Sequence, residues 1–181
     1  MAASPISPAD PSPNTASTPV ATTAPLSSPR DFDFLVGSWR VEHRRLKRRW
    51  TRSGDWDRFE GASTCRGALG GLVNIDEIAM PGRGFSGFTV RTFDLARRLW
   101  SIRWINSTRG VIEPPVVGRF ENGRGVFEGD DTDEGRAIRV RFVWDAITPD
   151  SARWRQAFSD DGGLTWETNW VMVFTRAGLV R

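Results

Sequence analysis

Bulky apolar residues occupy every second position in several stretches of this chain, and arginines and other polar residues fill the positions between them. The pattern is plainest over 100–104, 138–144, 154–158 and 170–174. Between 138 and 142, for example, arginines alternate with Ile138, Val140 and Phe142. Strict alternation is typical of a strand with one buried and one wet face, as in antiparallel sheets. The sequence therefore predicts an all-β protein.

Short turn sequences separate these stretches, among them Asn122-Gly123, which favours a tight hairpin. We expect a single antiparallel up-and-down β-barrel of about eight to ten strands, either filled or holding one small ligand. A short helical turn should precede it near 29–36, since Pro29 suits a first helical turn and Gly37 a stop. Phe32 and Leu35 would face the core.

Residues 1–30 have a different composition. They hold seven of the eleven prolines and none of the nine Trp, eleven Phe and eighteen Gly. So few bulky apolar side chains cannot offset the entropy of ordering, and we expect a disordered tail. The barrel is then expected over 31–176 and a short C-terminal tail over 177–181.

Composition also excludes several classes of protein. No apolar run approaches the ~20 residues of a membrane helix, and prolines interrupt any signal-peptide pattern near the N-terminus. A single cysteine, Cys65, excludes a disulfide framework. These features favour a cytoplasmic protein with no membrane partner.

The densest basic run carries Trp50 within it and comprises Arg40, Arg44, Arg45, Lys47, Arg48, Arg49 and Arg52. Such a run can bind nucleic acid, but acidic residues at 55, 57 and 60 follow at once. Because the net charge is only +3, we expect a solvated, salt-bridged hairpin and no nucleic-acid partner.

A family resemblance rests on four motifs: Phe34-Leu35-Val36-Gly37-Ser38-Trp39, Asn74-Ile75-Asp76-Glu77, Trp100-Ser101-Ile102-Arg103-Trp104 and Trp166-Glu167-Thr168-Asn169-Trp170. With these, residues 31–176 resemble the calycin superfamily of lipocalin-like and nitrobindin-like barrels, and most nearly a bacterial domain family of unknown function. The resemblance implies that Trp39 packs beneath Arg176 at the barrel floor. It also implies a ligand cavity, but no reaction.

Haem provides a test of that resemblance. Nitrobindin-like barrels bind haem through a histidine late in the chain, whereas the only histidine here is His43. Haem binding is therefore disfavoured. One imidazole and one thiol cannot build a usual transition-metal shell, so we expect no metal and no cofactor.

Five residues are candidates for ligand contact because they lie on inward positions of the expected strands: His43, Asn74, Trp104, Asn106 and Gln156. Burial should disfavour the charged form of His43, which would orient a ligand, act as a base, or simply be satisfied by backbone. Asp76 shares a face with Asn74 and is either an acid–base group or the partner of an arginine. The amides and the tryptophan either contact a ligand or pack in the core.

Three functions remain open from the sequence. The first is binding of a small hydrophobic or aromatic ligand in an aromatic-lined cavity. The alternative is a calycin-like enzyme, a cyclase or isomerase, acting on a small hydrophobic metabolite in the same cavity. The third is a filled barrel that serves only as an interaction module. An exposed strand edge at the barrel seam would also allow a homodimer.

Overall fold

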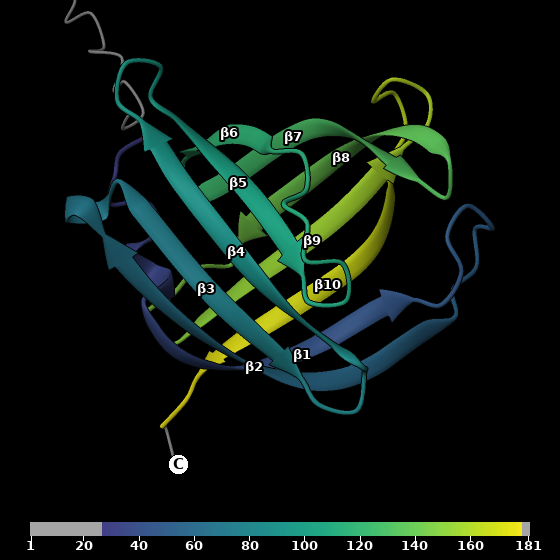
Figure 1. Cartoon of the computed structure of the whole chain (residues 1–181), viewed down its shortest axis with the longest axis horizontal. Coiled ribbons are helices and arrows are strands. Elements are labelled where there is room, and N and C mark those ends of the chain that lie inside the picture. Colours follow the sequence, from purple (N-terminus) through teal and green to yellow (C-terminus); the bar gives the residue numbers. More distant parts are fainter. Residues whose placement is uncertain (1–26, 179–181) are drawn as a thin grey trace, which may run out of the picture.

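Ten antiparallel strands form a closed barrel (Figure 1). The computed structural model describes residues 27–178. In chain order the elements are η1 (Asp33–Leu35), β1 (Gly37–Leu46), β2 (Trp56–Ala68), η2 (Leu69–Gly71), β3 (Val73–Met80), β4 (Phe85–Asp94), β5 (Leu99–Asn106), β6 (Val116–Glu121), β7 (Arg124–Asp133), β8 (Arg136–Asp145), β9 (Ser151–Ser159) and β10 (Glu167–Arg176). Strands consecutive in the chain pair with one another, and β1 closes the ring by pairing with β10. The predicted all-β, up-and-down barrel is confirmed.

The alternation in the sequence becomes an alternation of burial in the barrel wall. In β1, the side chains of Trp39, Val41 and His43 are buried, whereas Arg40 and Glu42 are exposed. A strand that buries every second residue presents one face to the interior and one to water. The short turn η1 precedes β1 as predicted, with Phe32 and Leu35 buried.

Carboxylates on neighbouring strands hold many of the outward arginines. Glu128 on β7 accepts hydrogen bonds from Arg139 at 3.0 Å and from Arg141 at 2.7 Å, both on β8. Asp145 at the end of β8 is paired with Arg153 and Arg155 on β9. Such cross-strand pairs place carboxylates beside arginines on the outer face of the barrel, as expected of opposite charges on neighbouring strands.

Two turns show how side chains and backbone angles shape the hairpins, and the first of them is the one that the sequence predicts. The β6–β7 hairpin places Asn122 at φ 51° and Gly123 at φ 73°, the positive angles that a tight two-residue hairpin needs. In the β9–β10 turn, the Asp161 carboxylate accepts the backbone N–H groups of Leu164 at 3.0 Å and Thr165 at 2.9 Å. Both turns set the register of the strands they connect.

The pairing of β5 is shorter on its β6 side than on its β4 side. β5 pairs with β4 from Leu99 to Asn106, but with β6 only from Trp100 to Ile102. Pro114 and Pro115 lie just before β6, and proline has no backbone N–H to give to a ladder. Beyond Ile102, β5 pairs with the loop before β6, through the Ile105–Ile112 bridge and the Glu113 backbone N–H, which donates to the Trp104 carbonyl oxygen at 2.9 Å.

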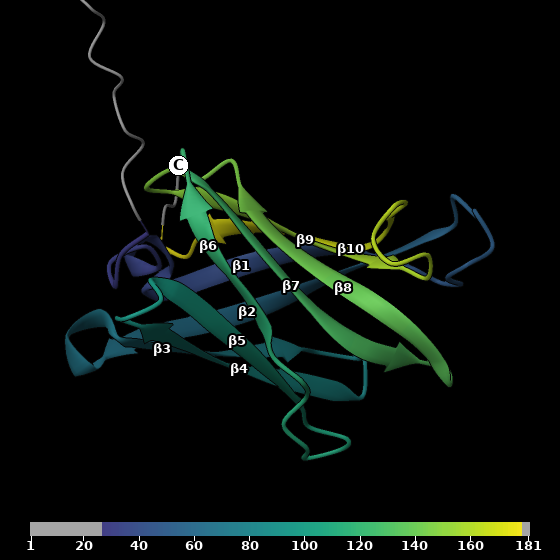
Figure 2. The same cartoon turned by 90° about the horizontal axis from the view of Figure 1, so that it is seen from above.

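The segment before β1 closes the opposite end of the barrel, where η1 lies in Figures 1 and 2. One oxygen of Asp31 accepts hydrogen bonds from the Ser27 hydroxyl at 2.5 Å, the Ser28 backbone N–H at 2.8 Å and the Trp100 indole at 3.2 Å. Asp31 thereby fastens this segment to β5. Ser27 to Arg30 fall within the expected tail, whereas residues 1–26 and 179–181 lie outside the described residues.

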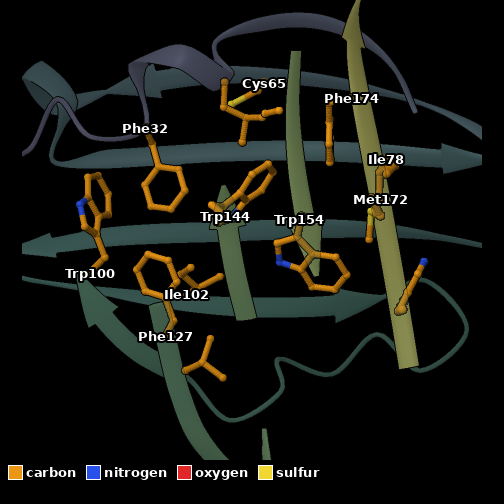
Figure 3. Packing of buried hydrophobic residues seen from close by; sticks show 14 of the residues in the cluster. Phe32, Cys65, Ile78, Trp100, Ile102, Phe127, Trp144, Trp154, Met172 and Phe174 are labelled. Atoms are coloured by element: carbon orange, nitrogen blue, oxygen red, sulfur yellow. The ribbon is translucent and has the colours of Figure 1, made fainter. Parts of the chain in front are cut away.

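Phe32 fills the closed end as the centre of an aromatic cluster (Figure 3). The distances between its ring centre and those of Trp100, Phe120, Phe127 and Trp144 are 4.8, 5.0, 5.9 and 6.3 Å. Edge-to-face contacts predominate, as aromatic pairs prefer. This cluster packs one half of the interior solidly.

Arg176, the last residue of β10, links the last strand to the first strand and to the segment before it at the closed end of the barrel. Its guanidinium carbon lies 3.8 Å from the ring centre of Trp39. The guanidinium also donates to the carbonyl oxygens of Val36 at 2.6 Å, Phe34 at 2.9 Å and Pro149 at 3.2 Å. One side chain thus joins η1, β1, β10 and the β8–β9 loop.

Two expectations on partners concern membranes and a second copy of the chain. Between residues 27 and 178, no helix is long and apolar enough to cross a bilayer. The barrel seam is closed by β1–β10 pairing from Trp39–Arg176 to Arg45–Trp170, so no free edge lies there. A homodimer stays a prediction.

Replacing Arg176 with Met should lower the free energy of unfolding by about 3 kcal/mol, because several carbonyl oxygens lose a charged donor and Trp39 loses its cation. Urea denaturation followed by tryptophan fluorescence measures the change. The matched control is Arg66→Met on the exposed outer face of β2, which should stay within about 0.5 kcal/mol of the wild type. Equal effects of the two substitutions would contradict the role of Arg176.

Candidate functional site

A cavity of about 260 Å³ lies inside the barrel, between the aromatic cluster and the open end. Its volume approaches the range of small-molecule sites, which begins at about 300 Å³. Aromatic side chains from five strands line it: Phe85, Trp104, Phe142, Trp144, Trp154, Phe158 and Trp170. The interior of the barrel is therefore partly open, and aromatic side chains form much of its wall.

Charged side chains surround the open end, here called the mouth and formed by Arg45, Arg49, Arg109, Glu113, Asp131 and Asp133. Arg49 and Asp133 form a two-point ion pair at 2.8 and 2.7 Å, and the Trp50 indole donates to the same carboxylate at 2.8 Å. Burial alone would raise the pKa of Asp133, but the bonds from Arg49 and Trp50 lower it below its ordinary value.

Arg45 is the mouth residue without a carboxylate partner among the described residues. Its guanidinium lies 4.6 Å from the ring centre of Trp170 and 5.7 Å from that of Phe85. Burial, with Arg49 and Arg83 nearby, lowers the pKa of Arg45, but a guanidinium stays charged in proteins. A cation held by aromatic faces at a cavity mouth can receive an anionic group of a ligand.

An ion pair lies within the cavity wall, away from the mouth. Arg91 on β4 and Asp76 on β3 are both buried, and Arg91 Nη1 lies 2.5 Å from Asp76 Oδ1, though off hydrogen-bond alignment. Arg91 Nη1 also donates to the Asn74 side-chain oxygen at 2.8 Å. Asp76 is thus the partner of an arginine, one of the two alternatives left open by the sequence.

Asn74 supports this pair from behind and is not part of the cavity lining. Its oxygen accepts from Arg91 and, at 3.3 Å, from the Cys65 thiol. Burial raises the pKa of Cys65 to about 11, so the thiol stays protonated near neutral pH. Asn74 therefore positions Arg91.

His43 is buried, and it too lies behind the cavity wall. Its Nδ1 accepts a hydrogen bond from the Trp170 indole at 3.2 Å, and its ring stacks on Phe59 at 4.5 Å between ring centres. Burial, then Arg45 and Arg83, lowers the pKa of His43 from 6.5 to about 4. A neutral His43 holds Trp170, and Trp170 in turn lines the cavity.

The other candidate residues, Trp104, Asn106 and Gln156, all line the cavity. Trp104 lies against the wall because Gly87, on the neighbouring strand β4, has no side chain: a Cβ there would be 1.6 Å from the indole. The Gln156 amide donates to the Asn169 oxygen at 2.8 Å, and the Asn106 oxygen caps the loop that begins at Thr108. Each of the two amides therefore already makes a hydrogen bond within the protein.

The basic run divides between the two faces of the barrel. Lys47 pairs with Asp55 at 3.1 Å, as expected of a salt-bridged hairpin. Arg45 and Arg49, by contrast, line the mouth of the cavity. Arg45 lies two positions after His43, so its inward position had a signal in the strand period.

Arg91 is the main site residue that sequence reasoning missed. It lies on the inward positions of β4, two residues after Thr89 and two before Phe93. That parity was the available signal, but arginine is almost never fully buried unless it is paired, and the sequence alone does not show the partner.

Comparison with known proteins supports the fold. No protein-family model matches the chain, and no curated protein matches it. The S-type phycobiliprotein lyase CPES from Guillardia theta has a similar structure, with a TM-score of 0.54 and 14% identity over 83% of this chain and 93% of that one. A protein of unknown function from the DUF3598 family of Nostoc punctiforme has a TM-score of 0.50 and 13% identity, over 87% of this chain and 53% of that one.

This chain thus spans about half the length of the Nostoc protein. At these identities the likeness shows the fold alone. The finer assignment to the calycin superfamily stays a prediction.

His43 should make stability depend on pH between 6.5 and about 4. The folded pKa lies below the unfolded one, so the unfolded chain binds a proton first and stability falls as pH drops through this window. His43→Gln removes the effect. Between pH 7 and pH 5, the wild type should lose about 2 kcal/mol more than the variant in urea denaturation. Parallel losses would contradict a buried neutral His43.

Proposed function

We propose that this protein binds a small, mostly apolar or aromatic molecule inside its barrel, at the cavity described above. The observation that carries the proposal is the combination of an open interior of about 260 Å³ with walls of Trp and Phe. Pockets of this kind usually combine apolar walls with a few polar groups that fix orientation. The calycin assignment belongs to the same proposal.

We assign ligand contact to Trp104, Asn106 and Gln156, which line the cavity. His43 and Asn74, also candidates from the sequence, take supporting roles. His43 fixes the indole of Trp170, and Asn74 fixes the guanidinium of Arg91. Groups locked in this way cost little entropy when a ligand binds.

We favour binding over catalysis. A cyclase or isomerase would need an acid or a base that faces its substrate. His43 lies outside the cavity lining, and Asp76 is tied to Arg91. An interaction module without a ligand is favoured less, because such a barrel has no need of an open interior.

The structural likeness to a phycobiliprotein lyase supports the proposal. Its name links a barrel of this fold to a class of pigment-bearing proteins. A small pigment-like molecule is therefore one member of the ligand class we propose. The size of the cavity favours a compact planar molecule, or one whose remaining part extends through the mouth.

The fluorescent probe N-phenyl-1-naphthylamine tests the proposal, because its emission rises in an apolar site. We expect saturable binding to the wild type. Val140→Phe should weaken binding at least about tenfold, since Val140 is buried and lines the cavity, and a larger side chain there fills it.

The matched control is Ala137→Phe, on the same strand but exposed. It adds the same phenyl group outside the barrel and should bind the probe as the wild type does. Binding that survives Val140→Phe, or that Ala137→Phe removes equally, would contradict an interior site. Native mass spectrometry of protein purified from its own host would then look for a retained small molecule.

A further inference from the structure

Three polar side chains form a cluster on the cavity wall, the inner polar subsite: Asp76, Thr89 and Arg91. All three are buried, and all three line the cavity. Asp76 faces Thr89 across the β3–β4 ladder, and Arg91 follows Thr89 by one inward position. The other charged residues that line the cavity are those of the mouth and Asp130 on β7.

The ion pair does not satisfy itself. Arg91 Nε and Asp76 Oδ1 are sealed from solvent and have no hydrogen-bond partner. Because all three residues line the cavity, their remaining polar atoms, Arg91 Nη2, Asp76 Oδ2 and the Thr89 hydroxyl, are the ones that a ligand would meet. Buried polar groups are normally paired, so a donor and an acceptor left side by side call for a complementary group.

Aromatic rings fix the guanidinium in place. Its carbon lies 5.0 Å from the ring centre of Phe32 and 5.9 Å from that of Trp144. Asn74 holds Nη1 at 2.8 Å from the other side. The subsite is therefore preorganised: Arg91 has little freedom to turn away and find a protein partner.

Charge decides which ligand group fits. Arg91 and Asp76 neutralise each other, so a carboxylate bound here would bring an uncompensated negative charge into an apolar cavity, beside Asp76. A neutral group with a carbonyl oxygen next to an N–H meets no such penalty. Its oxygen accepts from Arg91 Nη2, and its N–H donates to Asp76 Oδ2.

Resting on the proposed function, we propose that the inner polar subsite recognises a neutral amide edge, a carboxamide or lactam, on an aromatic ligand. Arg91 donates to the carbonyl oxygen of that edge, and Asp76 accepts from its N–H. A ligand with a carbonyl alone would leave the Asp76 Oδ2 acceptor without a donor. A ligand with a carboxylate would be repelled by the negative charge of Asp76.

Three probes with one ring system test this inference: 2-naphthamide, methyl 2-naphthoate and 2-naphthoate, titrated into the full chain and followed by calorimetry or tryptophan quenching. The wild type should bind the amide roughly ten to a hundred times more tightly than the ester or the carboxylate, because only the amide satisfies both groups. Val140→Phe should weaken all three.

Asp76→Asn should reverse the ranking, because Arg91 then lacks a countercharge: the carboxylate should bind at least about tenfold more tightly than to the wild type. The matched control is Glu77→Gln, the next residue on β3, which is exposed and should leave the ranking unchanged. Circular dichroism checks that each variant is folded. The wild-type ranking decides the matter if Asp76→Asn does not fold.

Two negative outcomes are distinguishable. Equal affinity for amide and ester in the wild type, or a ranking that Asp76→Asn leaves unchanged, would overturn the amide subsite while an interior ligand site stands. Failure of all three probes to bind, together with failure of N-phenyl-1-naphthylamine, would overturn the proposed function as well.

Discussion

The packing of Phe32 at one end of the barrel is the interaction on which the rest of this structure depends. Its ring contacts Trp100, Phe120, Phe127 and Trp144, which come from four different strands. This plug gives the barrel a solid core in one half, so stability does not require that the other half be filled. The residues that line the cavity in the other half can then include polar and charged side chains.

The aromatic cluster around Phe32 also stabilises the buried ion pair of Arg91 and Asp76. Removing a guanidinium and a carboxylate from water costs several kcal/mol, which a single contact rarely recovers. Here Phe32 and Trp144 flank the guanidinium, and Asn74 adds a hydrogen bond. Among the described residues, Arg91 Nε and Asp76 Oδ1 have no hydrogen-bond partner, which is unusual in a core built for stability.

Local pattern was enough to predict the fold but not the site. The strand period predicted the barrel, and Ser28-Pro29 with Gly37 predicted the turn before it, since these signals act between near neighbours in sequence. The inward position of His43 was also predictable. Its separation from the cavity was not, because Trp170, which comes between them, lies 127 residues later in the chain.

Burial, and after it the charge of Arg45 and Arg83, lowers the pKa of His43 and keeps the imidazole neutral. Arg45 lies over Trp170, and Arg83 lies 4.4 Å from the ring centre of Phe59, so both aromatic partners of the imidazole carry a cation on another side. A charged imidazole among these groups would be repelled, whereas a neutral one accepts the Trp170 N–H. Trp170 is thereby fixed from both sides, by a cation and by a hydrogen bond. The one histidine of the chain thus helps to position an aromatic residue of the cavity wall.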